Sequence, residues 1–157
     1  MKLIDAITYL CSKYPYKDEL SNARVTKMIY LADWRHALDK KVPLTNITWE
    51  FNHFGPWVPD VLNEARAHPE SIELVPGRTA FGSDKVCFEA RSDARWDSLT
   101  VEELTYLDQV VESTKQLTFQ GFIDLVYGTF PVRRSKRYDT LDLAAFAAQY
   151  WREQADA

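Results

Sequence analysis

The chain has 157 residues, 46% hydrophobic and 13% aromatic, so it is long and apolar enough to fold around a core of its own. Its formal net charge of −4 argues against binding nucleic acid over the whole surface, although a local basic patch could still act. No apolar run approaches the roughly 20 residues that span a bilayer, and the acidic Asp5 comes too early for a signal peptide. We therefore expect a single cytoplasmic domain over residues 1–157, with no membrane partner.

Two helices are predicted in the first forty residues. Apolar residues at helical spacing predict a helix over 2–13, which ends before Pro15. Ser21 can cap a second helix that is apolar around much of its circumference, which is typical of a central helix. On this helix Lys27, Tyr30 and Trp34 share one face, with Asp33 beside it. This face is either a functional one or part of the core, with Lys27 extending its amine to solvent.

The rest of the chain is expected to hold one aromatic-rich turn in place. Residues 48–54 read as a short strand, and Gly55-Pro56 reads as a tight turn. We expect Pro56 at or near the first turn of the next helix, where its missing N–H costs least. That helix carries an apolar stripe from Val58 to Ala65 and ends at His68-Pro69.

The second half predicts a small sheet and then more helices. Residues 72–75 and 85–89 are rich in β-formers and predict antiparallel strands, to which the strand before Gly55 could add. Thr100 and Glu103 form a capping box for a helix that runs to about Lys115. Thr118 can cap another helix that ends at Phe130-Pro131, and Asp142 can cap a last one over 143–154. The predicted fold class is mainly α (α+β), a compact helical domain with a small antiparallel β element.

Familiar catalytic and cofactor motifs are absent from the sequence. There is no GxGxxG, GxxxxGK[ST], GxSxG or HExxH, and the three histidines lack ligand spacing, so we expect no cofactor and no metal. Cys11 and Cys87 lie outside any CxxC; a disulfide between them stays open beside the simpler interpretation of buried free thiols. One enzyme hypothesis uses His53 as a base that Asp33 orients. A histidine among aromatics at a turn is more often structural, so we expect no enzyme.

A basic run follows the predicted helix that ends at Phe130. It contains four cations in five residues: Arg133, Arg134, Lys136 and Arg137. Such a run could bind phosphate, nucleic acid or an acidic partner. It is also typical of a solvated loop between helices.

Two motifs in a fixed order resemble a known family. They are Lys27-Met28-Ile29-Tyr30-Leu31-Ala32-Asp33 and, after Ile47-Thr48-Trp49, His53-Phe54-Gly55-Pro56-Trp57-Val58-Pro59-Asp60-Val61. Both resemble the Panacea domain, the SocA-like antitoxin family of bacteria, phages and mobile elements. In that family a Lys-Leu-x-Tyr-Phe/Leu-Ala helix and a strand precede Tyr-Gly-Pro-x-x-Pro; here Phe54 replaces the common Tyr. The likeness covers roughly residues 1–130. Tyr127 stands where many members carry His, and Pro131-Val132 where they carry Pro-Trp.

The resemblance implies a mainly helical antitoxin that binds and neutralises a co-encoded protein toxin. The signature is carried by Lys27, Tyr30, Asp33, Trp49, His53, Gly55 and Pro56. Trp34 and Trp57 are contact candidates if they are exposed, because aromatic residues are favoured at interfaces. Equally, the signature could shape the domain without touching a partner. Other possibilities are an adaptor that delivers a toxin to a protease, a nucleic-acid-binding regulator that uses Arg133 to Arg137, and an accessory protein of a phage or mobile element.

Overall fold

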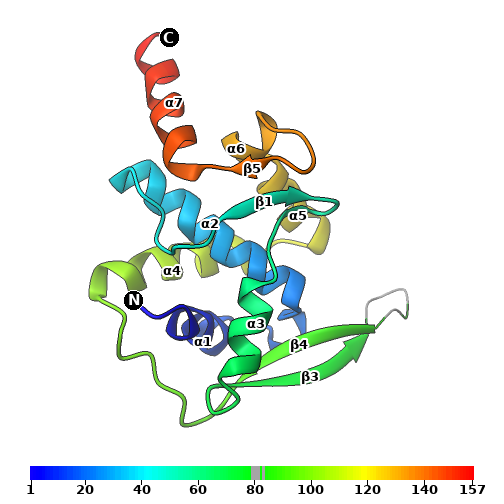
Figure 1. Ribbon diagram of the computed structural model, residues 1–157. Coiled ribbons are helices and arrows are strands. Elements are labelled where there is room, and N and C mark those ends of the chain that lie inside the picture. Colours follow the sequence, from blue (N-terminus) through cyan, green and yellow to red (C-terminus); the bar gives the residue numbers. More distant parts are fainter. Residues whose placement is uncertain (79–81, 83) are drawn as a thin grey trace.

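The computed structural model describes residues 1–78, 82 and 84–157 (Figure 1). Its helices are α1 (Leu3–Lys13), α2 (Asn22–Lys40), α3 (Asp60–Ala67), α4 (Val101–Thr114), α5 (Phe119–Tyr127), α6 (Phe130–Arg133) and α7 (Leu143–Ala155), with a 3₁₀ turn at Lys17–Glu19. Its strands are β1 (Trp49–Asn52), β2 (Gly55–Trp57), β3 (Ile72–Arg78), β4 (Asp84–Ala90) and β5 (Thr140–Leu141). The predicted class, mainly helical with a small antiparallel β element, is confirmed.

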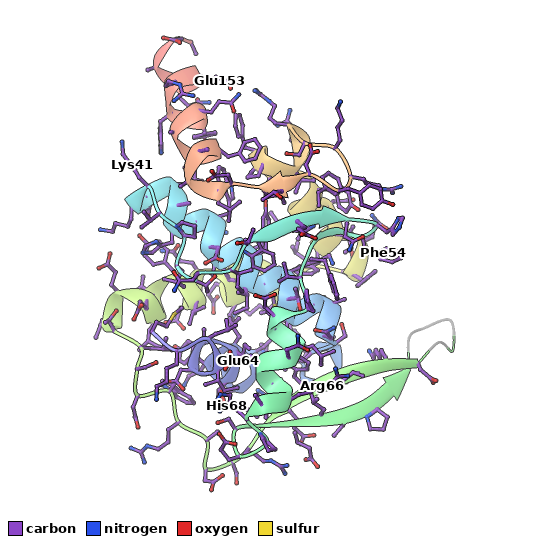
Figure 2. All side chains as sticks on the ribbon, viewed as in Figure 1. Lys41, Phe54, Glu64, Arg66, His68 and Glu153 are labelled. Carbon is purple, nitrogen blue, oxygen red and sulfur yellow. The ribbon has the colours of Figure 1, made fainter. Side chains whose placement is uncertain are left out.

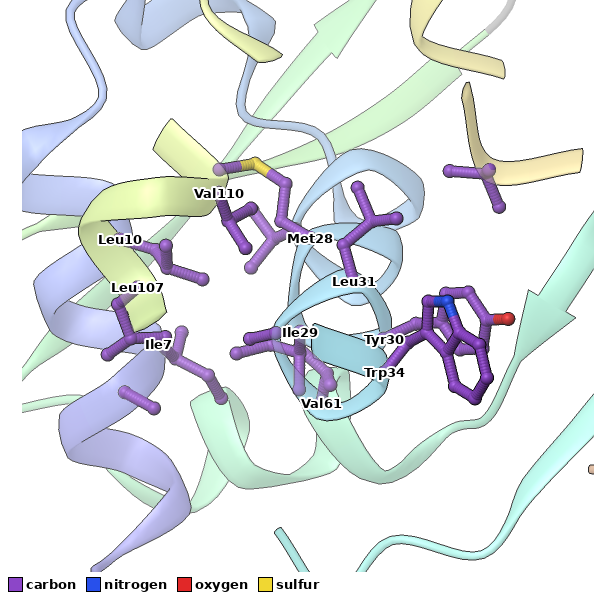
Figure 3. Close-up of a cluster of buried hydrophobic side chains, with 14 of the residues drawn as sticks. Ile7, Leu10, Met28, Ile29, Tyr30, Leu31, Trp34, Val61, Leu107 and Val110 are labelled. Carbon is purple, nitrogen blue, oxygen red and sulfur yellow. The ribbon is translucent and has the colours of Figure 1, made fainter. Parts of the chain in front are cut away.

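Helix α2 runs through the middle of the molecule, as its apolar circumference predicts (Figure 1). Ser21 caps it by accepting a hydrogen bond from the Arg24 backbone N–H at 3.2 Å. Every residue from 24 to 34 is buried. One side of α2 packs against α1, α3 and α4, whereas Tyr30 and Trp34 leave it on another side (Figure 3). Because both sides are covered, α2 organises the core.

The helix caps predicted at Thr100, Thr118 and Asp142 are present in the structure. The capping box of Thr100 and Glu103 is present at the start of α4. Thr118 accepts from the Gly121 N–H at 3.0 Å, and Asp142 accepts from the Ala145 N–H at 3.0 Å. Both predicted helices therefore begin where their caps place them.

Within the part of the chain that the structure describes, five strands form two separate sheets, and this corrects two expectations. The strand before Gly55 does not join the β3–β4 hairpin; it is the centre of a sheet with the antiparallel order β2-β1-β5. Pro56 lies in β2, paired with Phe51, rather than in a helix. Strand β2 is an edge, where the missing N–H of proline removes no ladder bond. Helix α3 begins only at Asp60, with Pro59 at its N-cap.

The structure also answers the question left open about the two cysteines, and it shows how long and how apolar the helices are. Cys11 and Cys87 are both buried free thiols, so the disulfide left open by the sequence is not formed. Burial raises the pKa of the Cys11 thiol to about 12. Among the described residues, no helix combines the length and apolarity needed to cross a membrane.

Candidate functional site

The signature residue Asp33 ties the β1 region to α2. It is fully buried, and its carboxylate accepts hydrogen bonds from the Thr45 backbone N–H at 2.7 Å and from Trp49 Nε1 at 2.7 Å. The Thr45 hydroxyl donates a third. Burial raises the pKa of Asp33, while these hydrogen bonds act to lower it. The role that this geometry gives Asp33 is to hold strand β1 against the central helix.

Two further aromatic residues of the α2 face are core residues. Tyr30 is fully buried; its ring meets Trp49 edge-on at 5.5 Å, and its hydroxyl lies 2.8 Å from Thr129 Oγ1. Trp34 is buried as well, stacked on Phe130 at 6.4 Å between ring centroids. Trp34 therefore lacks the exposure on which its prediction as a partner contact depended.

The β1–β2 turn carries an outward-facing aromatic. Asn52 pairs with Gly55, which leaves His53 and Phe54 as the two turn residues. Gly55 has φ +94°, and a Cβ built there would lie 3.3 Å from Tyr127 Cε2, so glycine is needed both for its backbone and for this close approach. Phe54 is 77% exposed and projects from the body of the protein (Figure 2).

The His53–Asp33 pair of the enzyme hypothesis is not formed. His53 is exposed, with its Nε2 3.1 Å from the Tyr138 hydroxyl. Asp33 is buried and bonded to Thr45 and Trp49 instead. Among the described residues, no group of three or more His, Cys, Asp or Glu side chains gathers closely enough to hold a metal ion.

A pocket of about 350 Å³ lies between α2, the β1–β2 turn and α5; we call it the Lys27 pocket. Its lining residues are Ala23, Arg24, Lys27, Phe54, Trp57, Phe119, Gln120, Phe122, Ile123 and Tyr127. Two of them are exposed aromatics, Phe54 and, at 65% exposure, Phe119. Trp57 is half-buried. The pocket thus joins a signature lysine to an accessible aromatic surface.

Lys27 is the unusual member of this lining. Its side chain is only 1% exposed, which overturns the interpretation that it extends to solvent. Burial lowers its pKa from 10.5 to about 8. Among the described residues, no hydrogen bond or ion pair involves its amine, and the undescribed positions 79–81 and 83 hold no acidic residue. The pocket lining therefore includes a lysine that is almost wholly buried and has no carboxylate partner among the described residues.

A second cation, Arg24, lies in the same lining but is largely engaged. It donates to the Tyr14 hydroxyl at 2.7 Å and to the Thr114 carbonyl at 3.2 Å, and its guanidinium lies 4.3 Å from the centre of the Phe122 ring. Glu19 is 3.5 Å away. Its Nε is buried without a partner among the described residues.

The predicted basic run is partly committed to the fold. Arg134 makes two hydrogen bonds to Glu153 on α7, at 2.8 and 2.7 Å, and lies over the Phe130 ring. This pairing raises the pKa of Arg134. Arg137 lies 3.5 Å from the His53 carbonyl, while Arg133 and Lys136 are exposed. An anion-binding role for the run stays a prediction.

Several residues of the pocket were not singled out from sequence: Arg24, Phe119, Phe122 and Ile123. The sequence of the 119–127 helix does contain a signal for this surface. Its apolar residues are not confined to one face, and they include Phe119, which is exposed at the first position of the helix. A surface helix normally confines such residues to one stripe.

Comparison with families of known proteins matches residues 25–130 to the family described as antitoxin SocA-like, Panacea domain. The chain belongs to this family. The match covers about two thirds of the chain and includes every member of the Lys27 pocket except Ala23 and Arg24. It confirms the resemblance drawn from the two motifs. No curated protein and no solved structure matches the chain.

Proposed function

We propose that this Panacea-domain chain is an antitoxin that neutralises a co-encoded protein toxin by binding it directly. The observation that carries the proposal is the family match over residues 25–130. An antitoxin of this kind acts in the cytoplasm, needs no cofactor and catalyses no reaction. Adaptor activity toward a protease, or carriage on a phage or mobile element, is compatible with the same proposal.

We propose the Lys27 pocket as the toxin-binding surface. Phe54 and Phe119 are large, apolar and mostly exposed, and they line the same pocket as the half-buried Trp57. Aromatic side chains that are grouped at a pocket are typical anchors of protein interfaces. A group of exposed apolar side chains indicates an interaction surface, whereas single exposed apolar residues are common on any protein.

The nucleic-acid alternative has less support. Arg134 of the basic run makes two hydrogen bonds to Glu153, so phosphate would have to compete with that carboxylate. Nucleic-acid binding would also have to overcome the net charge of −4.

The test is to express each neighbouring open reading frame with and without this chain, scoring growth and co-purification. We expect one neighbour to stop growth alone, and this chain to restore growth and co-purify with it. Replacing Phe54 and Phe119 together by Ala should abolish both effects. Val101→Ala is the matched control, because Val101 is 83% exposed on α4, outside the pocket. The proposal fails if no neighbour is toxic, and the proposed surface fails if the double variant still protects.

A further inference from the structure

The charge balance of the Lys27 pocket is one-sided. Lys27 and Arg24 both line it, and no Asp or Glu does. Glu19 neutralises Arg24 from outside the lining, at 3.5 Å. No corresponding carboxylate reaches Lys27 among the described residues, so Lys27 is the cation of the lining that has no carboxylate near it.

A buried ammonium group without a partner is costly, because it has lost its water and gained no opposite charge. Attraction to an anion is also stronger in such a place than at an exposed site, since the surrounding dielectric is low. The pocket is thus complementary to one negative group that arrives from outside the chain.

The walls restrict what can carry that group. They are mostly aromatic and aliphatic, and the neutral polar side-chain groups of the lining residues are Gln120, the Tyr127 hydroxyl and the Trp57 indole N–H. A main-chain segment inserted here would bury N–H and C=O groups with few partners. A side chain with an apolar stem and a terminal carboxylate would place methylenes on the aromatic walls and leave its own backbone outside.

We infer that the Lys27 pocket receives a glutamate side chain of the partner protein, whose carboxylate pairs with the Lys27 amine while neighbouring apolar side chains of the partner cover Phe54 and Phe119. This inference rests on the proposed function for the existence of a protein partner. It adds the chemistry by which the partner is recognised and assigns Lys27 as the residue that selects it.

The test uses three N-acetylated tripeptides as probes: acetyl-Leu-Glu-Leu-amide, its Gln counterpart, and acetyl-Leu-Gln-Leu with a free C-terminal carboxylate. Each is titrated at millimolar concentration into the ¹⁵N-labelled full chain at pH 7. Amide shifts of residues 23–27, 54, 55, 57 and 119–127 report occupancy of the pocket. We expect the Glu peptide to bind at least about tenfold more tightly than either other peptide.

Lys27→Met keeps the length and apolar stem of the side chain and removes its charge, so it should erase this preference. Lys41→Met removes the same charge from an exposed position at the end of α2, outside the pocket lining, and should leave the preference intact. Equal binding of the Glu and Gln peptides, or no binding of the Glu peptide, overturns the inference. Tighter binding of the free-carboxylate peptide overturns the choice of a side chain over a chain end.

These outcomes are separate from those of the growth test. If a neighbouring toxin is neutralised but the Glu peptide shows no preference, the inference fails and the proposed function stands. If the preference is present and depends on Lys27 but no neighbour is toxic, the proposed function fails and the site stands.

Discussion

Lys27→Met should make the isolated protein more stable, although Lys27 belongs to the family signature. The wild-type fold buries an ammonium group without a counter-ion. The pKa displacement from 10.5 to about 8 corresponds to roughly 3 kcal/mol of unfavourable interaction at neutral pH, at about 1.4 kcal/mol for each unit. Partial access of the amine to the open pocket reduces this figure, so we expect a gain of about 1–3 kcal/mol.

Urea unfolding at pH 7, followed by tryptophan fluorescence, measures the gain. For a domain of this size it corresponds to a rise in melting temperature of roughly 2–4 °C for each kcal/mol. Lys136→Met is the control, because surface substitutions usually change stability by less than about 0.5 kcal/mol. A Lys27→Met variant that is no more stable than the wild type would refute the reasoning.

The pH dependence gives an independent check on the cause. Because the pKa of Lys27 is lower in the folded state, the unfolded chain binds more protons between pH of about 8 and 10.5. The Lys27 contribution to wild-type stability therefore improves as pH rises through this window. The advantage of Lys27→Met should be complete below pH of about 8 and vanish above about 10.5. An advantage that does not change with pH would show that packing, not charge burial, produces it.

Three further substitutions test the frame around the pocket. Gly55→Ala should lower the free energy of unfolding by about 2 kcal/mol or more, because Gly55 has a positive φ and its added Cβ would lie 3.3 Å from Tyr127. Gly82→Ala should lower it by only about 1 kcal/mol, because Gly82 has φ +80° but nothing within 4 Å of an added Cβ. Equal urea midpoints for the two variants would contradict this. Asp33→Asn should lower the free energy of unfolding by about 2–3 kcal/mol. The side-chain NH₂ of Asn is a donor, and it would face at least one of the three donors that now bond to the Asp33 carboxylate. An unchanged urea midpoint would argue against this network. Arg134→Ala should speed amide hydrogen exchange in α7, because it removes the two hydrogen bonds from Arg134 to Glu153. Unchanged exchange would show that this pair does not stabilise α7, and Arg134 would then be available to bind anions.

Local chemistry made the helices predictable. The capping box at Thr100 and the caps at Ser21, Thr118 and Asp142 each act within three residues, so the sequence contains the whole interaction. The central position of α2 is predictable for the same reason, because the spacing of apolar residues within one helix shows how much of its surface is apolar. Helix starts therefore agree with the structure wherever a local cap decides them. The end predicted at Phe130-Pro131 is wrong, because α5 ends at Tyr127 and Phe130-Pro131 begins α6, where proline is tolerated in the first turn.

The β element was misread because its pairing is not local. Gly55-Pro56 is a turn signal by itself, and a helix start at Pro56 agrees with the apolar stripe that follows. What keeps Pro56 in a strand is antiparallel pairing of β2 with β1, which is itself held by β5 some ninety residues later. The contact between Gly55 and Tyr127 joins distant segments too. No local pattern contains these partners.

The contacts of the signature residues separate those that stabilise the fold from Lys27, the residue that we propose for binding. Tyr30, Asp33 and Trp49 are buried, fully partnered and explained by the contacts that they make with one another and with Thr45 and Thr129. Lys27 lies one helical turn before Tyr30 and has no such explanation, because its burial opposes folding. Natural proteins break such local rules mainly at functional sites and compensate for the cost elsewhere. A signature residue that destabilises the free protein is better explained by a partner than by the fold, and this distinguishes Lys27 from the residues around it.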